Sequence, residues 1–262
     1  MKLLSGWYSF FRSWFLRSIG LGLLILGLFA CSIPTQAGNA QTTDPQLEAK
    51  VLQVIRNHPE VILESVKAYQ QKQQQEQKQS QNKILEEMKA NPQSLIGTSP
   101  AIGSKTQKIV LLEFSDFQCP YCAKAHETLK QFMATNQNQV TLVYKFLPLT
   151  QIHQEAMNSA KSAWAAGQQG KFWEFHNALF TQQDKLGEPL YVATAKALNL
   201  DLKKFDQDRQ GEAASAAIQK DVELAEKLGV AGTPFLVMNG NPLSGAVEVP
   251  ELEALLANTN KS

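Results

Sequence analysis

Three hydrophobic patterns follow one another along the chain. A continuous apolar run covers residues 18–33, apolar residues at helical spacing follow from residue 47, and from residue 108 short apolar runs alternate with helical segments. A period near 3.6 indicates amphipathic helices, whereas a short apolar run bounded by turns is typical of a buried strand. The pattern therefore predicts a separate N-terminal segment, a helical region and an α/β domain.

The first run has the layout of an export signal. Basic residues precede it, namely Lys2, Arg12 and Arg17. The run itself is shorter than the roughly 20 residues that a membrane-spanning helix needs. A positive region followed by a short apolar core and small residues favours a signal peptide over a retained membrane anchor. We assign residues 1–40 to one of these two.

The same run ends in "LFAC", which resembles the lipobox of bacterial lipoproteins. In that case Cys31 would be lipidated and become the new N-terminus. Alternatively, Cys31 is a small apolar residue that is discarded with the signal. Each of these alternatives places the rest of the chain outside the cytoplasm, in the periplasm or its equivalent, where disulfides can form.

Residues 41–94 are predicted to form a helical stalk or linker. Leu47, Val51 and Val54 make one apolar stripe, and Pro59 is well placed to begin a second helix. The tract 70–81 is almost wholly Gln and Lys, which favour helix. Such a polar helix has little apolar surface of its own. It either packs on the main domain or pairs with copies of itself, and a solvated spacer is the alternative.

Residues 95–258 are predicted to be an α/β domain. "KIVLLEF" (108–114) is a buried central strand, and "QVTLVYKF" (139–146) is a second strand, parallel to the first through an intervening helix. Helical segments fill about 151–229, and a strand pair and a closing helix follow.

Charge and cysteine content exclude several classes of function. Lys and Arg total 25 and Asp and Glu total 24, so the net charge is +1. Nucleic-acid binding usually needs a clear basic excess. Three cysteines are too few for a disulfide-stapled scaffold. No cofactor is expected beyond a redox-active disulfide.

The chemistry is expected at the "CPYC" motif. Cys119 follows a strand, and Pro120 fits the first position of a helix because its missing N–H has no role there. The free amides and the dipole of that helix favour a thiolate, whose pKa falls to about 3.5–7 in such motifs. Cys122 lies one turn further on. We assign Cys119 as the attacking nucleophile and Cys122 as the resolving thiol.

A metal site is the alternative for the same motif. His126 lies four residues after Cys122 on the same helix face, which would give two thiolates and an imidazole for copper or zinc. A structural zinc site usually has four ligands, and the chain has no second CxxC. The other interpretation of His126 is a partly exposed helix residue.

Three stretches together resemble the DsbA family of thioredoxin-fold thiol–disulfide oxidoreductases. They are "VLLEFSDFQCPYC", "GKFWEFHNALF" and "LGVAGTPFLVMNG". The resemblance covers residues 95–258. It implies a thioredoxin fold with a helical domain inserted at about 151–229 and preceded by N-terminal helices. Cys119 and Cys122 would be its redox pair.

The resemblance also implies a substrate-binding surface around the redox pair. Pro234 would be a cis proline preceded by Thr233, and Pro120 and Tyr121 would complete the surface. An extended substrate would then add as a strand along the exposed backbone of this loop.

Glu113 matches the family's buried acid beneath the active site. A buried carboxyl has a raised pKa and could relay protons to or from Cys122. The alternative for Glu113 is an edge or bulge residue that reaches solvent.

The N-terminal helices, with "NHPEV", are similar to those of the ScsC/Com1-like branch, in which they precede an oligomerising stalk. The resemblance implies a homo-oligomer that forms, reduces or isomerises disulfides in cysteine-containing secreted proteins. It also implies a membrane redox partner of the DsbB, DsbD or VKOR type. The Pro-Tyr dipeptide differs from the Pro-His of strongly oxidising members, which favours a milder potential. A chaperone-like binding scaffold is a further alternative.

Overall fold

The computed structural model of the chain describes residues 44–245 and 247–260. The signal sequence and lipidation site predicted within residues 1–40 lie outside the described residues. The described chain forms two units that divide between Pro59 and Glu60. No helix among the described residues is long and apolar enough to cross a membrane.

The described part of the first unit, from residue 44, contains the helix α1 (Pro45–Asn57). The Asp44 side chain caps it by accepting a hydrogen bond of 2.9 Å from the Gln46 N–H. Pro45 occupies the first helical position, where no N–H is needed. Every residue of α1 is exposed, including Val51 and Val54 of the predicted apolar stripe.

The second unit is built on a five-stranded sheet in the order β1-β3-β2-β4-β5. The strands are β1 (Ala101–Gly103), β2 (Ile109–Ser115), β3 (Val140–Phe146), β4 (Phe235–Met238) and β5 (Asn241–Ser244). β2 and β3 are parallel, and the other pairs are antiparallel. The predicted strand–helix–strand unit and the later strand pair are confirmed, whereas β1 was not predicted.

β2 is buried over its whole length because both faces of the sheet are covered. Ile109 and Leu111 pack on the side of α3 (Pro120–Asn136) and α9 (Val249–Thr259). Val110 and Leu112 pack on the opposite side. Successive strand residues face opposite ways, so a strand covered on both faces has the continuous apolar run seen in the sequence.

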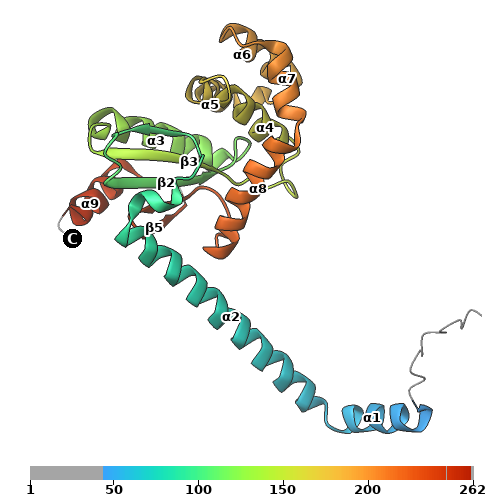
Figure 1. Ribbon diagram of the computed structural model, residues 1–262. Coiled ribbons are helices and arrows are strands. Elements are labelled where there is room, and N and C mark those ends of the chain that lie inside the picture. The colour runs from blue at the N-terminus through green and yellow to red at the C-terminus, as the bar shows by residue number, and fades with distance from the viewer. Residues whose placement is uncertain (1–43, 246, 261–262) are drawn as a thin grey trace, which may run out of the picture. The chain divides into compact units, whose positions relative to one another are not determined.

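The inserted helical domain lies between β3 and β4. It consists of α4 (Ala156–Gly167), α5 (Phe172–Thr181), α6 (Glu188–Ala197), α7 (Leu202–Gln210) and α8 (Glu212–Lys227). A short 3-10 turn within the insertion, Gln183–Lys185, follows α5, and another, Pro92–Leu95, lies outside the insertion before β1. Figure 1 shows α4 to α7 grouped together, with α8 leading back towards the sheet. The thioredoxin-like architecture with a helical insertion is confirmed.

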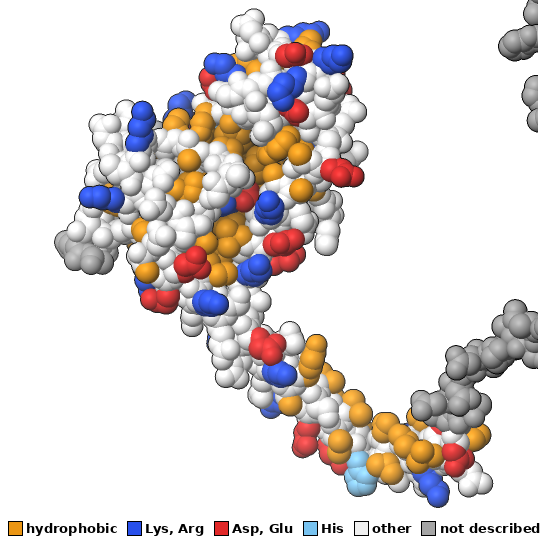
Figure 2. Space-filling model, viewed as in Figure 1, with side chains coloured by type: hydrophobic (Ala, Val, Ile, Leu, Met, Phe, Trp, Pro, Cys, Tyr) orange, Lys and Arg blue, Asp and Glu red, His pale blue; other side chains and the backbone are white. Residues whose placement is uncertain are grey.

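The helix α2 (Pro59–Ala90) has two different halves. Its final turns pack on the sheet, where Met88 is fully buried and Ile84 and Leu85 join the same apolar cluster. Its first turns expose apolar side chains, which Figure 2 shows in orange along this helix. The Gln-rich tract is helical. The end of α2 is therefore part of the domain core.

A buried ion pair joins the insertion to the sheet. Lys145 on β3 lies 3.1 Å from a carboxylate oxygen of Asp221 on α8, and both side chains are less than a tenth exposed. The Lys145 ammonium also donates to the Ser99 hydroxyl at 2.8 Å. The second oxygen of Asp221 accepts from the Phe146 N–H at 3.0 Å. These partners offset part of the cost of taking the two charges out of water, although burial still raises the pKa of Asp221.

Removing one member of this pair should destabilise the domain strongly. Lys145→Met would leave the Asp221 carboxylate buried without its counter-charge, at a cost of about 3–5 kcal/mol in the free energy of unfolding. The double variant Lys145→Met/Asp221→Leu should recover a large part of that loss. Urea titrations measure both values. Lys171→Met, which breaks an exposed pair with Glu174, is the control and should cost less than about 1 kcal/mol. Equal losses of unfolding free energy in Lys145→Met and Lys171→Met would contradict the prediction.

Candidate active site

The "CPYC" motif lies where β2 gives way to α3. Cys119 is the N-cap residue with extended backbone angles, and Pro120 is the first residue of the helix. The Cys122 N–H donates to the Cys119 carbonyl at 3.0 Å, which closes the first turn. Both cysteines are buried free thiols. The helix start is thus fixed directly under the Cys119 sulfur.

Asp116 orders the loop that carries Cys119. Its carbonyl accepts from the Cys119 N–H at 3.1 Å. One carboxylate oxygen accepts from the Gln118 N–H at 2.9 Å. The other accepts from the Leu149 N–H at 2.9 Å and lies 2.8 Å from His153 Nδ1. A fully partnered buried carboxylate holds a loop in one conformation. Sequence reasoning missed Asp116, and it found no role for His153.

Gln183 holds the same loop from the inserted domain. Its Nε2 donates to the carbonyls of Phe117 and Cys119, at 2.8 and 2.9 Å. These carbonyls belong to Cys119 itself and to the residue two before it. The insertion therefore contributes directly to the geometry of the CPYC motif.

The pKa values of the two thiols are shifted in opposite directions. A hydrogen bond with Cys122, and further ones with Thr233 and the amides of the first turn, lower the pKa of Cys119 to about 5 against the opposing effect of burial. Burial first, and the neighbouring Cys119 second, raise the pKa of Cys122 well above its ordinary value. At neutral pH Cys119 is therefore a thiolate and Cys122 a thiol.

The segment before β4 faces this thiolate. The Thr233–Pro234 peptide bond is cis, which confirms the expectation. The Cys119 sulfur lies 3.4 Å from the Thr233 carbonyl oxygen. Pro234 is buried, whereas Tyr121 of the CPYC motif is 66% exposed. The structure thus brings the cysteines and the cis-proline loop (residues 229–234) together.

Glu113 is buried in the middle of the sheet. It pairs with Tyr144 on β3 and Leu236 on β4, and it is 1% exposed. Burial raises its pKa to about 7, and the nearby Ser115 opposes this. The alternative of an edge residue that reaches solvent is wrong, because β2 is a central strand.

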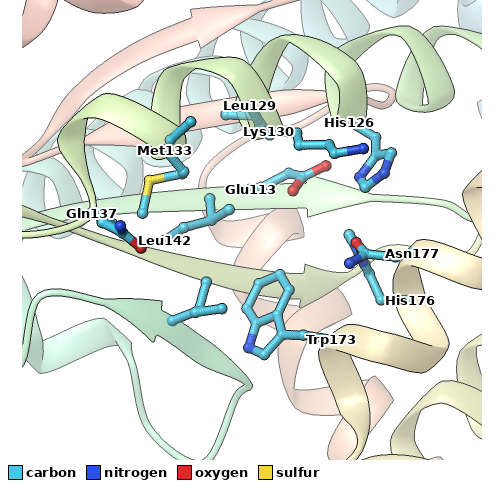
Figure 3. Close-up of a pocket in the computed structure, with 12 residues that line it drawn as sticks. Glu113, His126, Leu129, Lys130, Met133, Gln137, Leu142, Trp173, His176 and Asn177 are labelled. Atoms are coloured by element: carbon cyan, nitrogen blue, oxygen red, sulfur yellow. The ribbon is translucent and has the colours of Figure 1, made fainter. Parts of the chain in front are cut away.

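Figure 3 shows Glu113 beside a pocket of about 230 Å³ between α3, α5 and the sheet. The Glu113 Oε1 atom has no hydrogen-bond partner among the described residues. Apolar side chains, including Leu129 and Trp173, form much of the lining. An unpaired carboxylate is costly in such surroundings, so the acid form is favoured.

Ser115 and Tyr144 are site residues that sequence reasoning missed. The Ser115 hydroxyl lies close enough to lower the pKa of Glu113, Cys122 and Tyr144. Within the described residues this hydroxyl forms no hydrogen bond, so it lies near these groups without being bonded to them. Residues two apart on a strand share a face, so the spacing of Glu113 and Ser115 could have identified the serine. Tyr144 could not have been identified in this way, because its place opposite Glu113 depends on the register between β2 and β3.

His126 is neither a partly exposed residue nor part of a metal cluster. It is 6% exposed, and its ring stacks on Phe180 at 5.0 Å and meets His176 at 5.1 Å. Burial lowers the pKa of both imidazoles, that of His176 to about 3. Over the described residues, no three His, Cys, Asp or Glu side chains are grouped to hold a metal ion. The three-ligand hypothesis fails because the His126 ring packs against α5.

Glu113→Gln should stabilise the protein at pH 8 and leave its stability at pH 4 unchanged. A carboxyl whose pKa rises from 4.5 to about 7 on folding costs nothing below pH 4.5. Its destabilisation grows between pH 4.5 and 7 and then stays constant, at about 3 kcal/mol by the usual conversion. Denaturant titrations of the oxidised protein, in which neither cysteine ionises, measure this difference. Glu127→Gln, at an exposed position of α3, is the control. A gain that is equal at both pH values would contradict the prediction.

Known proteins resemble this chain in sequence and fold. The family model of the DSBA-like thioredoxin domain matches residues 110–257. A thioredoxin-like oxidoreductase from Silicibacter pomeroyi is 30% identical, with a TM-score of 0.60 over 66% of this chain and 99% of that chain. ScsC from Proteus mirabilis in a transitional conformation is 25% identical, with a TM-score of 0.59 over 82% of this chain and 93% of that one.

One similar curated protein is named as an antiporter. The Na(+)/H(+) antiporter NhaA 3 from Salinispora tropica is 33% identical over 152 residues, which are 58% of this chain and 23% of the antiporter. The chain thus spans about a quarter of the length of this relative, and antiport does not carry over. The family match covers more than half of the chain and contains both cysteines and the cis proline. The chain belongs to the DSBA-like thioredoxin domain family.

Proposed function

We propose that the protein is an exported thiol–disulfide oxidoreductase that acts on cysteines of secreted proteins. The observation that carries this proposal is the pair of unequal thiols. Cys119 has a pKa of about 5 at the start of α3, and Cys122 is a buried thiol with a raised pKa one turn away. A stable thiolate is a good leaving group and a ready nucleophile at neutral pH.

The oxidising cycle starts from a Cys119–Cys122 disulfide. A substrate thiolate attacks the Cys119 sulfur, the bond between the two cysteines breaks, and Cys122 leaves and takes up a proton. A second substrate thiolate then attacks the substrate sulfur of the mixed disulfide and releases the Cys119 thiolate. Two electrons pass from the substrate dithiol to the cysteine pair. Reduction of a substrate disulfide is the reverse sequence.

Glu113 supplies and removes the proton of Cys122. Its pKa of about 7 suits both directions at neutral pH. In this proposal Ser115, whose hydroxyl lies near both the carboxyl and the thiol, passes the proton between them. A buried thiolate without such a partner would be costly.

The substrate chain lies against Thr233 and Pro234, with Pro120 and Tyr121 beside it. The Thr233 carbonyl is next to the reacting sulfur, so a backbone paired with this segment brings its own cysteine to Cys119. A membrane partner of the DsbB, DsbD or VKOR type would accept or supply the two electrons. Export, by the signal in residues 1–40, would bring the protein to its extracytoplasmic substrates.

Refolding of ribonuclease separates the directions of this chemistry. Wild type should oxidise the reduced enzyme, rescue the scrambled enzyme, or do both, and Cys119→Ala should do neither because the nucleophile is lost. Cys122→Ala should retain the first attack and accumulate mixed disulfides, which non-reducing gels detect. Rescue of scrambled ribonuclease would assign an isomerase, and oxidation alone an oxidase. Equal activity of wild type and Cys119→Ala would refute the proposed function.

We also propose that α1 and the first turns of α2 associate with other copies of the chain. Apolar residues on these helices are between 39% and 71% exposed. They are Leu47, Val51, Leu52, Val54 and Ile55 on α1, and Val61, Ile62, Leu63, Val66 and Tyr69 on α2. Scattered exposed apolar residues are ordinary, but a run of them along a helix marks an interaction surface, as on α1 and, separately, on the first turns of α2.

Charge placed on this surface should dissociate the oligomer. Ile62→Glu/Val66→Glu puts two carboxylates one turn apart among the apolar residues and should lower the mass measured by light scattering. Gln70→Glu/Gln74→Glu adds the same charges at the same spacing further along α2 and should leave the mass unchanged. A monomeric wild type would exclude this role of the helices.

A further inference from the structure

The helix α2 caps the end of α8 with two glutamines. Gln77 Nε2 donates to the carbonyls of Glu226 and Lys227, at 2.7 and 3.2 Å. Gln81 Nε2 donates to the carbonyl of Leu228 at 2.8 Å. The last carbonyls of a helix lack partners within it. The Glu226 carbonyl also accepts from the Gly229 N–H at 2.9 Å, so the donors that the glutamines add from α2 serve chiefly the carbonyls of Lys227 and Leu228.

The capped carbonyls belong to the residues that lead into the active site. Gly229 follows at once, with a φ of 68° that favours glycine, and the Val230 N–H donates back to Ala225 at 2.9 Å. The chain then runs to Thr233, whose carbonyl lies 3.4 Å from the Cys119 sulfur. The end of α8 therefore sets where the cis-proline loop starts.

α2 also contacts the chain beyond this loop. A Cβ atom at Gly240, in the turn after β4, would collide with the Leu85 carbonyl, so the backbones approach closely there. Met88 packs in the same cluster as Val237 of β4. Thus α2 contacts the chain both before and after the segment that carries Thr233 and Pro234.

We propose that Gln77 and Gln81 are positioning residues for substrate binding. By holding the end of α8, they fix the cis-proline loop at the distance from Cys119 at which a substrate backbone can pair with it. This inference rests on the proposed function. It assigns a task at the active site to a helix that begins as an exposed stalk.

Four double variants of the full chain separate hydrogen bonding from packing. Gln77→Ala/Gln81→Ala removes the donors, and Gln77→Glu/Gln81→Glu keeps the shape but offers only acceptors to the carbonyls. Gln77→Lys/Gln81→Lys restores donors. Gln75→Ala/Gln79→Ala, at exposed positions with the same spacing, is the control. Packing alone predicts that the glutamate variant behaves like wild type.

Two kinetic assays show whether the effect passes through substrate binding. For a disulfide-bonded peptide, KM should rise about three- to tenfold in the alanine variant, as expected for lost hydrogen bonds of ordinary strength. It should rise more in the glutamate variant and return towards wild type in the lysine variant. Reaction with dithiothreitol, which has no backbone to pair, should change less than about twofold. An equal loss with both substrates would overturn the proposal.

Hydrogen–deuterium exchange tests the same contact without any activity. Amides of residues 229–233 should exchange faster in the alanine variant than in wild type or in the control variant. Unchanged exchange there would overturn the proposal even if the protein is an active oxidoreductase. Faster exchange in a protein without redox activity would instead refute the proposed function and leave the structural contact established.

Discussion

The site depends on the unequal surroundings of two sulfur atoms one helical turn apart. Cys119 lies at the N-cap of α3 with hydrogen bonds that favour its thiolate, whereas Cys122 lies inside the core, where charge is disfavoured. If both thiols were exposed, each would be a weak nucleophile at neutral pH. The surrounding sheet and insertion keep one sulfur near the surface of the site and the other beneath it.

The buried position of Cys122 makes proton transfer necessary. A thiol with a strongly raised pKa neither attacks nor leaves easily without a nearby group that exchanges its proton. Glu113 and Ser115 face the same side of β2 as Cys122, and burial gives the carboxyl a pKa near neutrality. Burial of Glu113 therefore lowers the stability of the protein, but it also raises the pKa of the carboxyl into the range that suits the proposed proton transfer. A polar group placed for function often lowers stability in this way.

Sequence analysis correctly predicted the features that a short stretch of the chain determines by itself. The strand before the motif and the proline at the helix start are short stretches with a direct structural meaning. The cis Thr233–Pro234 bond was expected from the family resemblance and is present. Sequence analysis was insufficient where the contact joins distant parts of the chain, as with Gln183 on the Cys119 loop or Lys145 with Asp221. His126 shows the remaining difficulty, because helical spacing predicted its face but not the α5 residues that pack on it.

The same reasoning explains why the Gln-rich tract was hard to interpret. Composition marks it as polar and helical, and both properties also fit a solvated spacer. Its glutamines differ in what they contact: Gln77 and Gln81 donate to carbonyls at the end of α8, although Gln77 is exposed, as Gln75 and Gln79 are. A long polar side chain with an N–H donor suits the bare carbonyls at a helix end better than an apolar one. A tract of one composition can therefore combine a solvent-exposed surface with a few contacts that order the active site.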